Sequence, residues 1–251
     1  MNIIGYGIDV SHAQNPATLP WATFQGKVDF VIVRANYGVR LDETAKAHVQ
    51  HARDIGAKVG LYSFFRPGQS WVDQASALES VADSVKLSSG DIVPALDIED
   101  DPFSMPKEVS PAWEDGCRRI IERWCDLYGD AMVYINQRLW TSLGRPEWVL
   151  HRPLWVENYR VIEPQSPAGM PPTIWQHRVD VFEQYGPSTE PEPPPPGTVD
   201  QNLLLLPLPL VGCRPTDDDQ ARVRALVAEN LRRVVEEPDI EELDPVTPRL
   251  S

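Results

Sequence analysis

The sequence predicts an α/β barrel, and three observations support this prediction. Short apolar runs alternate with segments of helical periodicity in the first half of the chain, which is the pattern of parallel strands joined by helices. Eight such apolar runs can be counted in 251 residues, a length that is common for barrels of this type. Helical segments become scarce in the second half. We therefore expect a barrel whose last turns have lost their helices.

The expected strands are apolar runs bounded by polar or turn-forming residues. Most of them are rich in valine, isoleucine, leucine and aromatic residues, which favour strands. In chain order they cover residues 6–10, 28–36, 58–65, 91–99, 131–136, 153–159, 172–177 and 198–205.

Three helices are expected between these strands, because apolar residues recur there with a spacing of 3.6 residues. They cover residues 44–55, 71–85 and 112–128. In the last of them, Trp113, Cys117 and Ile120 begin an apolar face that continues to the end of the segment.

Two further segments differ in composition from the rest. Residues 186–198 are so rich in proline that they cannot form a helix or a central strand, and we expect a stiff loop between the last two strands. After Cys213 the chain becomes highly charged, and residues 217–237 have the pattern of a helix. We therefore divide the chain into a barrel domain, residues 1–213, and a charged C-terminal helix and tail, residues 214–251.

The C-terminal helix has two interpretations. Its stripe can pack back on the barrel, or it can serve in docking or self-association, because the stripe nearly follows a heptad with an asparagine at a seam position. The stripe consists of Val223, Val227, Asn230 and Val234.

The charge and hydropathy of the chain exclude several classes of partner. A formal net charge of -14 argues against nucleic acid, since neutralising phosphates requires clustered lysine and arginine, and against adsorption to an anionic membrane. No apolar run reaches the roughly 20 residues of a membrane span. The first residues lack the basic and long apolar regions of a signal peptide, so we expect synthesis in a cytoplasm without a leader.

Four carboxylates are expected at one rim of the barrel. Asp97 and Glu99 face the same way because they are two residues apart at the end of a strand, the end where barrel enzymes hold their catalytic groups. Asp9 lies near the end of the first strand and Asp200 in the last, and these two strands are neighbours in a closed barrel. A single D-x-E pair is usually a solvated turn or an ion pair, but four carboxylates at rim positions indicate a site.

Such a cluster suits glycoside hydrolysis. Repulsion and burial keep one carboxyl protonated near neutral pH while its neighbours remain ionised. The protonated group can donate to the leaving oxygen, and the ionised ones stabilise an oxocarbenium-like transition state or activate a nucleophile.

Other polar and aromatic residues lie near the expected strand ends. Tyr62, Trp155 and Tyr159 can stack on sugar rings, although core packing is the alternative. Arg34 is expected as a structural partner of the acidic cluster more than as a substrate ligand. The remaining candidates for contact with substrate are Asn136, at a strand end, and His12, after the Asp9 loop.

No metal and no other cofactor is expected. His48 and His51 are three residues apart on a predicted helix, which is one arrangement for a metal pair. No third ligand stands at a supporting spacing, so we expect two surface histidines. No phosphate loop or dinucleotide fingerprint is present in the sequence.

Taken together, the motifs resemble the glycoside hydrolase family 25 lysozymes, which are N-acetylmuramidases. The resemblance covers roughly residues 5–206. The most specific elements are the first block together with the D-x-E strand and the final V-D-x-N. The matching pieces are GIDVSHAQ, FVIVRANYG, VGLYSFF, PALDIE, YIN, LWVENY, IWQH and VDQN.

The resemblance implies a fold, a reaction and residue roles. The fold is an incomplete TIM-like barrel with five β/α units followed by three strands that lack helices. The reaction is cleavage of the β-1,4 bond between N-acetylmuramic acid and N-acetylglucosamine in bacterial peptidoglycan. Glu99 matches the general acid, and Asp97 matches the carboxylate that stabilises the intermediate or orients the acetamido group of the substrate. Asp9 and Asp200 match acidic residues that flank the groove, and Tyr62 matches a groove tyrosine.

Several alternatives remain open at the level of the sequence. The attack can come from an enzyme nucleophile or from the acetamide of the substrate. Together with the expected lack of a leader, the resemblance suggests a phage endolysin that acts at the cell wall after release, or a virion-associated enzyme. A non-catalytic wall-binding module or a virion structural component on the same fold is the alternative function, since a fold alone does not guarantee activity.

Overall fold

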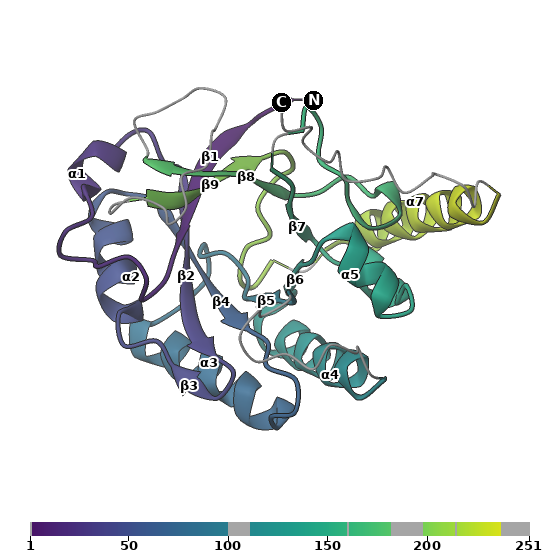
Figure 1. Cartoon of the computed structure of the whole chain (residues 1–251), viewed down its shortest axis with the longest axis horizontal. Coiled ribbons are helices and arrows are strands. Elements are labelled where there is room, and N and C mark those ends of the chain that lie inside the picture. Colours follow the sequence, from purple (N-terminus) through teal and green to yellow (C-terminus); the bar gives the residue numbers. More distant parts are fainter. Residues whose placement is uncertain (1, 100–110, 160, 182–197, 214, 237–251) are drawn as a thin grey trace, which may run out of the picture.

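The computed structural model describes residues 2–99, 111–159, 161–181, 198–213 and 215–236. Eight strands form a closed barrel in the order β1, β9, β8, β7, β6, β5, β4 and β2, and β2 pairs with β1 (Figure 1). The short β3 pairs antiparallel with the end of β2. The strands are β1 (Gly5–Val10), β2 (Phe30–Tyr37), β3 (Arg40–Leu41), β4 (Lys58–Phe64), β5 (Ala95–Asp97), β6 (Met132–Tyr134), β7 (Leu154–Glu157), β8 (Ile174–Val181) and β9 (Thr198–Leu204).

Helices follow the first five barrel strands, and in the described residues only a 3-10 turn, η1 (Pro167–Gly169), lies among the last three. The prediction of five β/α units followed by three strands without α-helices is therefore confirmed. The three long helices expected in the barrel and the C-terminal helix are all present. The α-helices are α1 (Trp21–Phe24), α2 (Ala45–Asp54), α3 (Trp71–Val85), α4 (Pro111–Tyr128), α5 (Gln137–Ser142), α6 (Glu147–Leu150) and α7 (Asp217–Glu236).

Strand β9 runs opposite to its neighbours, although the alternating pattern predicted parallel strands. It is antiparallel to both β1 and β8, whereas the other barrel pairs are parallel. A parallel return normally uses a helix, which the proline-rich sequence before β9 cannot form. Residues 186–197 of that expected loop lie outside the described residues. As a consequence, the beginning of β9 lies at the rim where the other strands end.

Side chains alternate between the barrel interior and the layer beneath the helices, as the two-residue period of a strand requires. On β2, Phe30 and Ile32 belong to the interior cluster, whereas Val31 and Val33 pack in the outer layer. Gly7 of β1 is in register with Phe30, and a Cβ atom there would lie 2.2 Å from the phenyl ring. Glycine at this position therefore leaves room for the phenyl ring of Phe30 inside the barrel.

The chain after β9 closes the end of the barrel opposite to that rim. Leu208, Leu210 and Val211 pack against the interior cluster. The backbone N–H of Val93 donates to the carbonyl of Pro209 over 3.0 Å, which fixes this segment to the chain before β5. Apolar residues of the described chain therefore close this end of the barrel, opposite the rim where the carboxylates were predicted.

Helix α7 packs on the barrel with the stripe that the sequence indicated. Val227 and Asn230 are buried, and the side-chain amide of Asn230 lies 3.2 Å from the sulfur of Met170, next to η1. Figure 1 shows α7 on the far side of the barrel from α2 and α3. Among the described residues, no helix combines the length and the apolar character that a membrane span requires.

Candidate active site

Five carboxylates meet at the open rim of the barrel. Asp9, near the end of β1, is in register with Asp200 near the start of β9. Asp97 ends β5 and Glu99 follows two residues later, so that both side chains project from the same face. Glu157 ends β7. The structure thus brings the four predicted carboxylates together and adds a fifth.

These groups line a cavity of about 210 Å³. Among the described residues that line it there is no lysine, arginine or histidine, so its negative charge is not balanced by an adjacent cation. The lining residues are Asp9, Tyr62, Asp97, Glu99, Tyr134, Trp155, Glu157, Tyr159, Gln176 and Asp200.

Aromatic side chains form much of the cavity wall. Trp155 packs edge-to-face against Tyr62, with ring centroids 5.9 Å apart, and against Tyr134, with centroids 4.8 Å apart. Trp155 is only 1% exposed, and its indole N–H donates to the Oδ1 atom of Asn202 over 2.8 Å. Tyr159 is more exposed at the rim. All three aromatic residues predicted to contact substrate therefore line the cavity.

A chain of hydrogen bonds fixes the position of Asp9. Its Oδ2 atom accepts from the side-chain amides of Gln176, over 3.0 Å, and Asn202, over 2.8 Å. The Oε1 atom of Gln176 accepts in turn from the phenol groups of Tyr134, over 2.8 Å, and Tyr159, over 3.1 Å. Asp9 is thus held by a polar network that spans β1, β6, β8 and β9.

Burial and mutual repulsion raise the pKa values of the predicted carboxylates. Burial, followed by the charges of Glu157 and Asp200, raises the pKa of Glu99 to about 7. Burial, followed by the charge of Glu157, raises the pKa of Asp200 to about 7. The pKa of Asp97 is raised well above its ordinary value by burial and then by Glu99, and that of Asp9 by burial and then by Asp200. Several of these groups therefore hold protons near neutral pH.

One carboxylate oxygen of Asp97 is buried without a hydrogen-bond partner in the described part of the chain. Its side chain is 5% exposed, and its Oδ1 atom has no hydrogen-bond partner among the described residues. A buried polar atom of this kind costs free energy unless a donor reaches it. Asp97 also lines the cavity.

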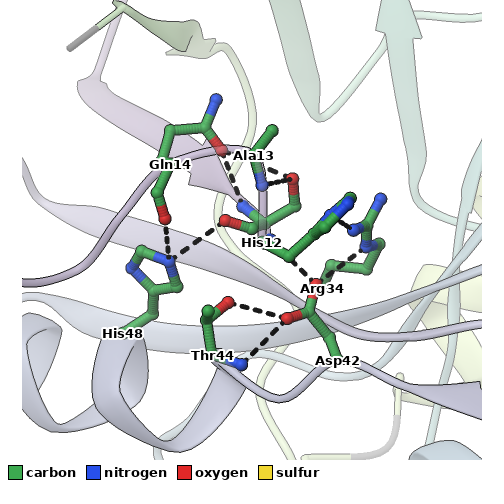
Figure 2. A network of polar contacts seen from close by, with 8 residues as sticks. His12, Ala13, Gln14, Arg34, Asp42, Thr44 and His48 are labelled. Carbon is green, nitrogen blue, oxygen red and sulfur yellow. Dashed lines mark hydrogen bonds and ion pairs between the residues drawn. The ribbon is translucent and has the colours of Figure 1, made fainter. Parts of the chain in front are cut away.

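Arg34 pairs with an acid outside the cavity. Its Nε atom lies 3.0 Å from Oδ2 of Asp42, and its Nη2 atom contacts Nδ1 of His12 (Figure 2). Burial by itself would raise the pKa of Asp42, but hydrogen bonds from Thr44 and His12 and the charge of Arg34 outweigh it, and the pKa is lowered. Asp42 is thus a stable anionic partner for Arg34. The arginine still lowers the pKa values of Asp97 and Glu99 by its charge.

The loop after β1 is held by two residues that follow β2 in the sequence. The backbone N–H of His12 donates to Asp42 over 2.9 Å. The Nε2 atom of His48 lies 3.1 Å from the carbonyl oxygen of Ser11 and 3.0 Å from that of Gln14, so this nitrogen carries the proton (Figure 2). Neither Arg34 nor His12 is among the residues that line the cavity.

The expectation that His48 lies at the surface is wrong. Its side chain is fully buried on the inner face of α2, together with Ala45, Val49 and Ala52. These positions have the spacing of an apolar helical stripe, a signal that outweighs the polar character of a single histidine. Burial lowers the pKa of His48, which favours the neutral ring that donates from Nε2.

Asn136 has a local structural role. It is the N-cap residue of α5, where its Oδ1 atom accepts a hydrogen bond from the backbone N–H of Leu139 over 2.9 Å. It is not among the cavity-lining residues. The structure therefore places Asn136 apart from the carboxylates.

Sequence reasoning missed three residues of the cavity wall, Tyr134, Glu157 and Gln176. All three lie within the motifs YIN, LWVENY and IWQH. Tyr134 and Glu157 end their strands, and Gln176 of β8 is in register with Glu157. Glu157 is two residues from Trp155, so the alternation rule that united Asp97 and Glu99 would have assigned it to the same face as the tryptophan. A consistent use of that rule on β7 would have found the fifth carboxylate.

Comparison with solved structures shows the same fold in proteins from several sources. The bacterial lysozyme from Streptomyces coelicolor is 25% identical, with 90% of this chain and 98% of that chain covered and a TM-score of 0.64. A muramidase from Trichobolus zukalii is 23% identical, with 90% and 99% covered and a TM-score of 0.63. The catalytic domain of an endolysin from a Listeria monocytogenes bacteriophage is 21% identical, with 89% and 98% covered and a TM-score of 0.58. The last two structures, at 23% and 21% identity, show a similarity of fold alone.

Comparison of the sequence with curated proteins gives no match. The family model described as glycosyl hydrolases family 25 matches residues 8–181, which is more than half of the chain. These residues include Asp9, Asp97, Glu99 and Glu157. The chain belongs to glycosyl hydrolase family 25 and is a glycosidase.

Proposed function

We propose that the chain is a peptidoglycan hydrolase that cleaves the β-1,4 bond between N-acetylmuramic acid and N-acetylglucosamine, with Glu99 as the general acid. The observation that supports this proposal most strongly is the state of Glu99. It is a partly exposed carboxyl at the cavity wall, and its pKa of about 7 allows it to hold a proton near neutral pH. Family membership and the likeness to a bacterial lysozyme support the substrate class.

The different roles proposed for Asp97 and Glu99 follow from how deeply each side chain is buried. Glu99 lies nearer to solvent than the buried Asp97, so Glu99 is the group that reaches the leaving oxygen. The productive form has Glu99 protonated and Asp97 ionised, with the negative charge of Asp97 facing the positive charge that develops on the sugar. Burial opposes this ionisation, whereas the charge of Arg34 favours it, and protonation of Glu99 removes the repulsion that follows burial among its obstacles. The protonation step is the same whether an enzyme carboxylate or the acetamide attacks.

Asp9 and Asp200 complete the electrostatic surroundings of the reaction. They are in register on adjacent strands, and the amides of Gln176 and Asn202 hold Asp9 in one orientation. A carboxylate fixed in this way stabilises a developing positive charge without reorganising during the reaction.

Tyr62, Trp155 and Tyr159 are assigned to substrate contact. Each lines the cavity, and an aromatic face packs well against the apolar face of a sugar ring. Tyr159 is the most accessible of the three, and its phenol group is oriented by Gln176. We do not assign Arg34, His12 or Asn136 to substrate contact, because each forms an intramolecular contact away from the cavity lining.

The test of the substrate class is digestion of two purified polymers that share the β-1,4 linkage. We expect soluble fragments from purified peptidoglycan and none from chitin, which lacks muramic acid. Chromatography of the soluble fraction measures both. Release from chitin alone would contradict the assignment, and release from neither polymer would favour the alternative of a non-catalytic wall-binding or virion structural protein on the same fold.

The place of action follows from the substrate. A protein that cleaves peptidoglycan acts at the bacterial cell wall, and we propose that it reaches the wall as a phage endolysin after release or as part of a virion. Purified phage particles from an infected culture would contain the chain in the virion case, whereas a released endolysin would remain in the particle-free lysate.

Self-association through residues 217–237 stays a prediction. The described residues of the stripe already pack on the barrel, so a dimer through α7 would have to use the outer face of the helix. Sedimentation equilibrium of the full chain is the measurement. A mass near twice 28.2 kDa would show that the chain forms a dimer. A mass of 28.2 kDa would exclude self-association at the concentration used.

A further inference from the structure

Glu157 is the cavity carboxylate to which no role has been given. It ends β7, on the face that also carries Trp155, and it is in register with Gln176 of β8. The phenol group of Tyr134 donates to its Oε2 atom over 3.4 Å. Glu157 is partly exposed, in contrast to the buried Asp97, and it lines the same cavity as Glu99.

We propose that Glu157 is a positioning carboxylate whose negative charge keeps Glu99 in the protonated form that donates to the leaving oxygen. This inference rests on the proposed function, because it concerns the group assigned there as the general acid. Glu157 acts through Glu99 and is not itself assigned to proton transfer.

The described groups that surround Glu99 come from seven strands, and half of them are carboxylates. Four other carboxylates and three phenols share its cavity, and among the described residues the cation Arg34 of β2 acts on it from outside the lining. The carboxylates are Asp9 of β1, Asp97 of β5, Glu157 of β7 and Asp200 of β9, and the phenols are Tyr62 of β4, Tyr134 of β6 and Tyr159 just after β7.

Among the described residues, the cation Arg34 does not balance this charge. Arg34 is bound to Asp42, with 3.0 Å between Nε and Oδ2, and Asp42 is fully buried at its side chain and stabilised as an anion by Thr44. The pair is close to neutral as a unit, so the field at Glu99 is dominated by the carboxylates. An excess of negative charge disfavours ionisation of Glu99.

Glu157 acts on Glu99 together with its neighbour Asp97. After burial, the charge of Glu157 raises the pKa of Glu99, ahead of that of Asp200, and the repulsion between Asp97 and Glu99 raises the pKa of Asp97. The charge of Glu157 is also the second cause, after burial, of the raised pKa of Asp200. The position at the end of β7 therefore affects two ionisable groups of the cavity at once.

The test is the dependence of kcat/KM on pH for Glu157→Gln. Activity requires protonated Glu99, so it falls as the pH rises through the pKa of Glu99 in the free enzyme. Removing the negative charge of Glu157 makes ionisation of Glu99 easier, which lowers that pKa. We expect the upper limb of the profile to shift to lower pH by roughly one unit.

Two variants serve as matched controls. Glu157→Asp keeps the charge and should keep the upper limb near that of the wild type, even if its shorter side chain lowers the overall rate. Glu147→Gln removes one negative charge from α6, where the carboxylate is 65% exposed, and should leave the profile unchanged. Together they separate the local charge from side-chain volume and from the net charge of the chain.

A second measurement does not require activity. The side-chain carboxyl carbon of Glu99 can be followed by ¹³C NMR during a pH titration of the full chain without substrate, with Glu99→Gln identifying the signal. The titration midpoint should be lower in Glu157→Gln than in the wild type and in Glu147→Gln. This readout applies even if Glu157→Gln is too slow for a pH profile.

The outcomes distinguish this inference from the proposed function. An unchanged upper limb and NMR midpoint, with or without an increase in KM, would overturn the role of Glu157 and leave Glu99 as the acid. An upward shift would also overturn it. If Glu99→Gln remains active, the assignment of the acid itself has failed, and the inference fails with it.

Discussion

Replacing Glu99 with Gln is expected to lower the rate of peptidoglycan cleavage by roughly 10²- to 10⁴-fold, the range typical for loss of a general acid. Glutamine has nearly the same shape as glutamic acid but has no acidic proton to donate to the leaving oxygen. The rate of release of soluble fragments at a pH below 7, where Glu99 of the wild type is protonated, measures the effect.

Thermal unfolding shows whether the fold survives this substitution. Because the pKa of Glu99 is raised in the folded state, its contribution to stability is present at low pH and is lost as the pH rises toward 7. A neutral glutamine should therefore be at least as stable as the wild-type residue at pH 8. The matched control is Glu122→Gln on the exposed surface of α4, which should keep full activity. A Glu99→Gln variant that keeps more than about a tenth of the wild-type rate, a difference of only ~1.4 kcal/mol in the barrier, would contradict the assignment.

Replacing Asp97 with Asn is expected to lower kcat by roughly 10²- to 10³-fold, comparable to the loss of one preorganised electrostatic contact. Asparagine keeps the size of the side chain but removes the negative charge that faces the developing positive charge on the sugar. Because this interaction is strongest in the transition state, kcat should fall much more than KM changes.

Steady-state kinetics on soluble peptidoglycan fragments separate kcat from KM for this variant. Asp126→Asn, on the exposed surface of α4, is the control for the loss of one aspartate charge and should have wild-type kinetics. If Asp97→Asn raises KM and leaves kcat unchanged, Asp97 binds the substrate and does not stabilise the transition state.

The fold was largely predictable because its strands and long helices have strong local patterns. The eight barrel strands correspond to apolar runs, and α3 and α4 have an apolar residue at nearly every turn on one face. The short helices α1, α5 and α6 were not predicted, because four to six residues are too few to show a helical period. The direction of β9 depends on how the chain returns from β8, which local periodicity does not record.

The candidate site was predictable where rim position and residue type coincide. Asp97 and Glu99 follow an apolar strand at a spacing of two, and closure of the barrel brings Asp9 next to Asp200. The partner of Arg34 could not be predicted in this way. Asp42 lies in the turn between β3 and α2, and only the folded chain shows that Arg34 pairs with this carboxylate and not with the carboxylates of the cavity.

The measurement that tests the account most directly is mass spectrometry of borohydride-reduced fragments from digested peptidoglycan, with Glu99→Gln in parallel. Borohydride reduces the sugar at each newly formed end and so identifies the bond that was cut. We predict reduced muramic acid ends from the wild type and almost none from Glu99→Gln. Reduced glucosamine ends would mean that a different bond is cleaved, and equal amounts of muramic acid ends from both proteins would mean that Glu99 is not the acid.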